Sequence, residues 1–175
     1  VLSIQESVRG SYHPDLAITL IGLGGALSSQ GRYEESERVH RRALLIQEDW
    51  FGFDAPQLLS SLVGLGMSAF MQDRYDESEA VFRRVLEIQE TVVGPDAPGL
   101  STTLDMLAMT LSASGRYEEA EGAYRQGIAI REAALDPDDL ELATSLENLG
   151  LALDNLGRHE EAEETYRRGI AIYEA

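Results

Sequence analysis

One short motif returns four times along this chain at a constant spacing. The hexapeptide Gly-Arg-Tyr-Glu-Glu-Ser at 31–36 is followed by related hexapeptides at 73–78, 115–120 and 157–162. The period is therefore 42 residues, with no insertion or deletion. Self-similarity at a fixed period of this size is typical of stacked repeats, each of which buries its apolar face against its neighbours. Such an array offers a long surface for binding rather than a deep catalytic pocket.

Each 42-residue repeat is predicted to hold two antiparallel helices joined by a short turn. In the second repeat the first helix runs to about Asp73, where the other repeats have a glycine that accepts the left-handed conformation. The second helix begins near Tyr75 and ends near Gly94. Paired arginines such as Arg83-Arg84 follow the acids of its first turn at helical spacing, which predicts ion pairs on a solvated face. Alternation with period two is absent, so no strands are expected.

Prolines mark the expected start of the first helices. Pro14, Pro56 and Pro98 share one register, and proline suits the first turn of a helix because its missing N–H has no partner there. The fourth repeat lacks this proline, but Asp138 and Asp139 offer capping oxygens instead. These features predict an all-α fold.

The chain is interpreted as a single array of helical hairpins. It begins inside the second helix of an earlier repeat and stops at the end of another second helix, so we expect further protein on both sides. The apolar strip of the last helix, with Ile170 and Tyr173, is expected to favour end-to-end self-association of such a fragment. The expected boundaries are 1–12 for the end of a preceding repeat, then 13–53, 54–95, 96–137 and 138–175 for repeats one to four.

The charge of the chain narrows its range of partners. The net charge is −17, with 31 acids against 14 bases, all of them arginine. Such a surface repels nucleic-acid phosphates and anionic membranes, so neither is an expected partner. The acidity serves solubility, and it also suits a basic partner. With no apolar run of membrane-spanning length and no visible secretory signal, we expect a cytoplasmic protein.

Leucines and small residues recur in the first helices, as in Leu62, Leu65 and Gly66, and a small residue and a ring recur in the second helices, as in Ser78 and Phe82. This pattern resembles the tetratricopeptide repeat. The 42-residue period, with the motifs GPD-x-P, GRYEEAE and A-I-R-E, resembles the kinesin-light-chain type of that repeat. The resemblance covers residues 13–175 and implies a right-handed α-solenoid. It also implies a protein–protein interaction scaffold, with a ligand- or peptide-sensing regulatory domain of a larger protein as the alternative.

In arrays of the resembled type the first helices line a concave groove, and a stripe about 140° from the leucines should face it. The methionines of this stripe suit an apolar partner, and the acids Asp105, Glu147 and Asp154 favour a cationic end. We therefore expect a protein or peptide segment with an apolar middle and a basic end. Ordinary core packing of the methionines is the alternative interpretation. We name the expected groove residues the stripe: Ile21, Val63, Met67, Phe70, Met71, Asp105, Met106, Met109, Glu147, Asn148, Leu151, Asp154 and Asn155.

Catalytic and cofactor motifs are not supported. Gly64–Ala69 fits a dinucleotide fingerprint, but it lies inside a predicted helix with no preceding strand. The repeat positions explain all three histidines, and no Ser-His-Asp set or metal-ligand spacing can be proposed. We therefore expect no enzyme activity, no cofactor and no metal. Trp50 and Phe51 are predicted to lie in a loop, where they either close the turn or form an exposed contact.

Overall fold

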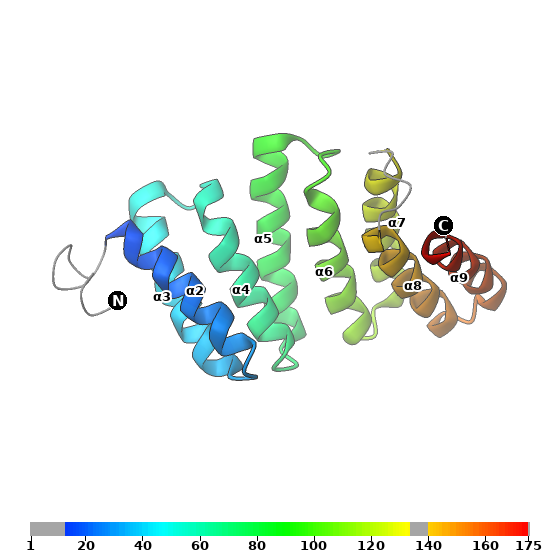
Figure 1. Cartoon of the computed structure of the whole chain (residues 1–175), viewed down its shortest axis with the longest axis horizontal. Helices are drawn as coiled ribbons and strands as arrows, with labels where there is room; N and C mark the ends of the chain where they lie inside the picture. Colours follow the sequence, from blue (N-terminus) through cyan, green and yellow to red (C-terminus); the bar gives the residue numbers. More distant parts are fainter. Residues whose placement is uncertain (1–12, 134–139, 175) are drawn as a thin grey trace. The chain divides into compact units, whose positions relative to one another are not determined.

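The structure is a computed structural model that describes residues 13–133 and 140–174 (Figure 1). All regular elements in these ranges are helices, so the predicted all-α class is confirmed. The chain divides into two compact units, residues 1–88 and residues 89–175, which are described separately. The handedness of the array and the predicted repeat boundaries stay predictions.

Unit 1 is built from helices whose apolar faces meet in pairs. Helices α2 and α3 form an antiparallel hairpin, and α3 also packs against α4 (Figure 1). One buried cluster joins α2 to α3, and a second joins η1 and α4 to α5. The elements are α2 (Pro14–Ser28), α3 (Tyr33–Phe51), the 3₁₀ turn η1 (Pro56–Leu58), α4 (Leu59–Phe70) and α5 (Tyr75–Val93), whose last turn belongs to unit 2.

Unit 2 repeats this plan with two complete hairpins. Helices α6 and α7 pack together, α7 packs on α8, and α8 pairs with α9. Helix α7 thus contacts both its own partner α6 and the first helix of the next hairpin, α8, as α3 contacts α2 and α4 in unit 1. The elements are α6 (Leu100–Ala113), α7 (Tyr117–Ala133), α8 (Leu140–Asn155) and α9 (His159–Tyr173).

The proline positions are only partly as predicted. Pro14 is the first residue of α2, where the His13 ring accepts a hydrogen bond from the Asp15 N–H at 3.2 Å. Pro56 opens a 3₁₀ turn rather than an α-helix. Pro98 does not start a helix, because its carbonyl closes a turn onto the Ser101 N–H and α6 begins only at Leu100. The predicted caps Asp138 and Asp139 lie outside the described residues.

The turns between the two helices of each hairpin follow the prediction. Gly31 has a φ of 74°, and its N–H donates to the Ser28 carbonyl while the next N–H donates to Leu27. These two hydrogen bonds close the helix, with the glycine in the left-handed conformation. The same pattern recurs at Asp73, whose φ of 58° makes it the one non-glycine among the described residues with positive φ.

In the hairpins α2–α3, α4–α5 and α8–α9, a glycine of the first helix faces a ring of the second. A Cβ atom on Gly66 would lie 2.8 Å from the Phe82 ring, and one on Gly150 would lie 2.6 Å from Tyr166. In the first hairpin the ring is His40, which is only 4% exposed. The leucine, small-residue and ring pattern of the sequence therefore corresponds to direct packing.

The second helices carry two kinds of ion pair. The predicted pairs within a helix are confirmed, for example Arg83 with Glu79 at 2.8 Å. The neighbouring Arg84 instead reaches the preceding second helix and pairs with Glu48 at 2.8 Å, a contact that the prediction missed. An arginine pair on one helix thus serves both that helix and its neighbour.

Candidate functional site

The part of the stripe in unit 1 lies on helices α2 and α4 and at the end of α4. Ile21, Val63, Met67 and Phe70 are half-buried, and Met71 is exposed. Val63 packs against the buried cluster of α4 and α5, and Ile21 packs against that of α2 and α3. These side chains therefore border the core and retain an accessible face.

In unit 2 the stripe lies on α6 and α8, and none of its members is fully buried. The half-buried members are Asp105, Met106, Met109, Asn148 and Asp154, and the exposed ones are Glu147, Leu151 and Asn155. Of the four methionines of the chain, Met67, Met106 and Met109 are thus half-buried, and Met71 is exposed.

The three acids expected to attract a basic ligand differ in their surroundings. Asp105 is paired with Arg131 at 2.8 Å, and Asp154 lies 3.0 Å from the His159 ring nitrogen. Glu147 is exposed and has no ion pair with the described residues. Of the three, Glu147 is thus the carboxylate most available to a cationic ligand.

An apolar cavity of about 480 Å³ opens on unit 1 beside the stripe. It lies where α2, the end of α3, η1 and the start of α4 meet. We call it the socket, and its lining residues are Pro14, Asp15, Ile18, Ile21, Gln47, Phe51, Gln57 and Ser60.

The surface of the socket is mostly apolar, and its one buried amide is already satisfied within the protein. Gln47 donates from its side-chain nitrogen to the Gln57 carbonyl at 2.7 Å and accepts from the Ser61 hydroxyl at 2.6 Å. Ile18 is 70% exposed and Phe51 is 43% exposed. Large apolar surface thus remains in contact with water at this place.

The equivalent place in unit 2 has a different chemistry. Two repeats further along the sequence, Asp105 stands for Ile21, Arg131 for Gln47 and Glu141 for Gln57. Arg131 is 5% exposed, and its guanidinium pairs with Asp105 at 2.8 Å and with Glu141 at 3.2 Å. An ion-pair network therefore occupies the position of the socket.

This network includes a hydroxyl that both units share. Ser145, which corresponds to Ser61, lies 2.8 Å from the Asp105 carboxylate and 3.1 Å from the Arg131 guanidinium. Burial raises the pKa of Asp105, and the attraction of Arg131 and the Ser145 hydrogen bond offset this only in part. The ionised carboxylate consequently depends on Arg131 for its stability.

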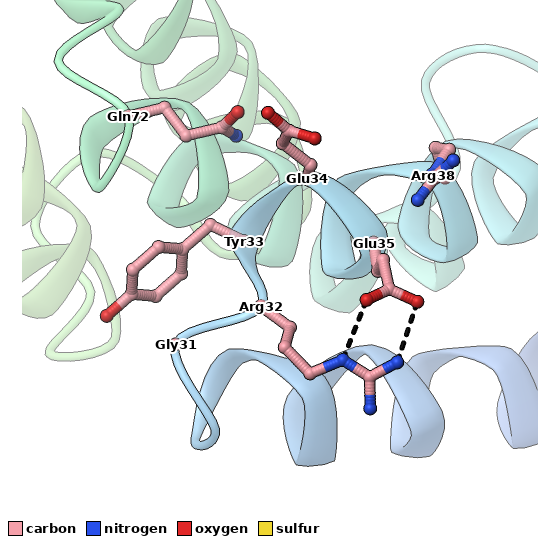
Figure 2. A pocket seen from close by; sticks show the side chains of 7 residues that line it. All are labelled: Gly31, Arg32, Tyr33, Glu34, Glu35, Arg38 and Gln72. Carbon is pink, nitrogen blue, oxygen red and sulfur yellow. Dashed lines mark hydrogen bonds and ion pairs between the residues drawn. The ribbon is translucent and has the colours of Figure 1, made fainter.

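A second, shallower hollow lies at the turn between α2 and α3 (Figure 2). Figure 2 shows the Arg32 guanidinium forming two hydrogen bonds of 2.7 Å to the Glu35 carboxylate across this turn. The equivalent motif at 157–161 forms a similar hollow of about 430 Å³. Because every 42-residue repeat encodes this turn, the hollow is a feature of the repeat and does not indicate a particular ligand.

Two features of this region differ from the sequence prediction or were missed by it. Trp50 and Phe51 are the last residues of α3, not part of a loop, and the Trp50 ring lies 5.8 Å from that of His13. That contact favours a role for Trp50 in closing the end of the hairpin. The buried arginine Arg131 was missed, although its departure from the glutamine at the equivalent position 47 was a readable signal.

Among the described residues no cluster of His, Asp and Glu has the arrangement of a metal site. Likewise, within the described ranges no helix combines the length and hydropathy that crossing a membrane requires.

Comparison with known families gives a consistent answer. A family model of the tetratricopeptide repeat matches residues 1–49, 57–133 and 128–175. No curated protein matches the sequence significantly.

Several solved structures share the fold. A Podosopora anserina putative kinesin light chain with nearly identical TPR-like repeats has a TM-score of 0.84 at 23% identity, with 98% of this chain and 82% of that chain covered. BtubC (BKLC) from P. vanneervenii has a TM-score of 0.85 at 19% identity, with 92% of this chain and 65% of that chain covered. Aspartyl phosphate phosphatase F from Bacillus subtilis has a TM-score of 0.79 at 16% identity, with coverages of 92% and 41%. The chain thus spans about two thirds or less of the last two proteins.

Proposed function

The chain belongs to the tetratricopeptide-repeat family, and on that premise we propose that it is a scaffold that binds a segment of a partner protein along the stripe. Proteins of this family are typically protein-interaction scaffolds and are generally non-catalytic. The proposed segment has an apolar middle and a basic end. The similarity to kinesin-light-chain-like repeats supports the fold. The chemistry of the partner is our proposal.

One observation carries this proposal. The first helices bury one leucine face and leave the stripe partly accessible in both units, with Leu151 57% exposed. Accessible apolar side chains on an otherwise strongly acidic surface suit a ligand that is apolar and basic. Methionine adds adaptability, because its unbranched side chain fits varied apolar partners.

Selection of binding peptides tests the proposal. A random 12-residue peptide library displayed on phage is selected on the whole chain, and enriched peptides are then measured by fluorescence anisotropy. We expect enrichment of sequences that combine arginine or lysine with large apolar residues. Enrichment of acidic or wholly polar sequences would contradict the proposed partner chemistry.

Two matched variants locate the binding surface. Leu151→Arg places a charge on the stripe, and Leu45→Arg places the same charge on the second helix α3, where Leu45 is 60% exposed. We expect Leu151→Arg to weaken binding of the selected peptides by about tenfold or more, a typical cost of losing an apolar contact and adding like charge. Leu45→Arg should leave binding within about twofold of the wild type. Equal effects would place the site elsewhere.

A further inference from the structure

The socket of unit 1 and the ion-pair network of unit 2 occupy equivalent places in two copies of one repeat. We propose that the socket anchors one large apolar side chain, such as leucine or phenylalanine, of a basic peptide segment, and that unit 2 has no such anchor because Arg131 and its acids occupy the place. This inference rests on the proposed function. It adds that a large apolar side chain determines specificity and that unit 1 binds this side chain.

The volume and lining of the socket carry the first step. A cavity of about 480 Å³ lies within the ordinary range of ligand sites, and it admits a large side chain with part of its neighbouring backbone. Ile18, Ile21 and Phe51 supply apolar walls, and the amide of Gln47 is satisfied within the protein. An incoming polar side chain would find no buried partner in the amide of Gln47, whereas an apolar one would remove water from the walls.

The charge of the socket and of the whole chain indicates which residues should flank the anchoring side chain in the peptide. The lining contains one charged residue, Asp15, and no arginine, on a chain with a net charge of −17. Asp15 is 43% exposed and lies at the start of α2. A segment with arginine or lysine next to its apolar residue therefore meets attraction along its path, while an acidic segment meets repulsion.

The counterpart in unit 2 explains why the anchor is specific to one unit. Arg131 extends between Asp105 and Glu141, and the Thr102 hydroxyl lies 3.4 Å from Glu141. These groups stand where Ile21, Gln57 and Ile18 stand in unit 1. Inserting an apolar side chain there would separate a buried charge from its partners, which costs more than the apolar contact contributes.

Four defined peptides provide the probe. The series acetyl-Gly-Arg-Gly-X-Gly-Arg-Gly-amide carries Leu, Phe, Ala or Asp at X, so that only the anchor changes. Titration into the whole chain with labelled isoleucine, leucine and methionine methyl groups reports where each peptide binds. We expect Leu and Phe peptides to bind at least about tenfold more tightly than the Ala peptide, with the largest shifts at Ile18 and Ile21.

Exchange of the two chemistries provides matched variants. I21D/Q47R/Q57E installs in unit 1 the network with which unit 2 already folds, and Ser61 is in place to support it as Ser145 does in unit 2. Ile18→Thr is the milder variant, since threonine stands at the equivalent position 102. We expect the triple variant to abolish the preference for Leu over Ala and Ile18→Thr to reduce it about threefold to tenfold. The reverse exchange D105I/R131Q/E141Q should create a second, weaker anchor in unit 2, because Thr102 still stands in place of Ile18.

The outcomes separate this inference from the proposed function. If the peptides shift stripe methyls such as Leu151 but bind equally with Leu and Ala at X, the socket is overturned and the scaffold stands. If no peptide moves any stripe residue, the proposed function itself fails. If dilution of the protein alone moves the Ile18 methyl, a second copy of the chain fills the socket and the peptide anchor is overturned.

Discussion

Arg131 and Asp105 form an ion pair of 2.8 Å at the place that Gln47 and Ile21 occupy two repeats earlier. Because Arg131 is 5% exposed, the pair is largely removed from water. One repeat architecture therefore accepts either an apolar wall with a satisfied amide or a buried charge network at the same position. That exchange leads to the first prediction.

Removing only one member of the pair should destabilise unit 2. Arg131→Met leaves the Asp105 carboxylate without its arginine, and we expect a loss of about 2–4 kcal/mol in the free energy of unfolding. Changing both residues to their unit 1 counterparts, D105I/R131Q, should return the stability to within about 1 kcal/mol of the wild type, because no unpaired charge remains. Urea denaturation followed by circular dichroism measures both. Arg167→Gln, which breaks the exposed pair with Glu163, is the control and should change stability by less than about 0.5 kcal/mol.

His40 predicts a pH dependence of stability. Burial lowers the pKa of His40 from its ordinary value of 6.5, so the unfolded chain binds this proton more readily than the folded chain. Its contribution is thus complete above about pH 7 and is lost progressively as pH falls from the unfolded pKa to the lower folded pKa, by up to about 1.4 kcal/mol per pH unit. Thermal unfolding between about pH 5.5 and 7.5 measures the slope, above the ordinary pKa range of carboxylates.

Two variants assign that slope to its residue. His40→Phe introduces the residue that occupies the same slot at position 82 and should flatten the profile. His159→Gln removes a side chain that is 76% exposed and should keep it. A wild-type slope retained in His40→Phe would refute the assignment.

Glycine substitutions should separate packing from helix propensity. Gly66→Ala places a methyl group 2.8 Å from the buried Phe82 ring, and we expect a loss of about 1–3 kcal/mol through overpacking. Gly22→Ala meets nothing within 4 Å in α2 and should instead stabilise the chain by about 0.5–1 kcal/mol. Denaturant midpoints give both values, and effects of the same sign would contradict the packing explanation.

Replacing Asp73 by glycine, the residue that its counterparts carry, should be less harmful to stability than replacing it by alanine. At a φ of 58° a side chain is disfavoured, although the Asp73 carboxylate accepts a hydrogen bond of 2.6 Å from the Tyr75 hydroxyl. We expect Asp73→Gly to be about 1 kcal/mol more stable than Asp73→Ala, because both lose that bond and only glycine removes the strain. A shift in melting temperature between the two variants measures the difference. Equal melting temperatures would show that this turn carries no strain.

Much of the architecture was readable without coordinates. The 42-residue period, the glycines at turns such as Gly31 and the small residue facing a ring predicted helical hairpins, and the helices lie where that pattern placed them. The exceptions are local. Pro98 was assigned to a helix start because proline favours the first turn, but its carbonyl is engaged in the preceding turn instead.

The sequence alone determined the repeated hairpin, since turn conformations and apolar periodicity depend on residues close together in the chain. Only the tertiary structure decided that Gln47 borders an open socket while Arg131 fills its counterpart. The partners of these two side chains come from separate helices, such as Ser61 on α4 and Asp105 on α6, so the outcome depends on which groups packing brings within hydrogen-bond distance. In the low-dielectric interior that distance sets whether a polar side chain is buried at a cost or becomes part of the core.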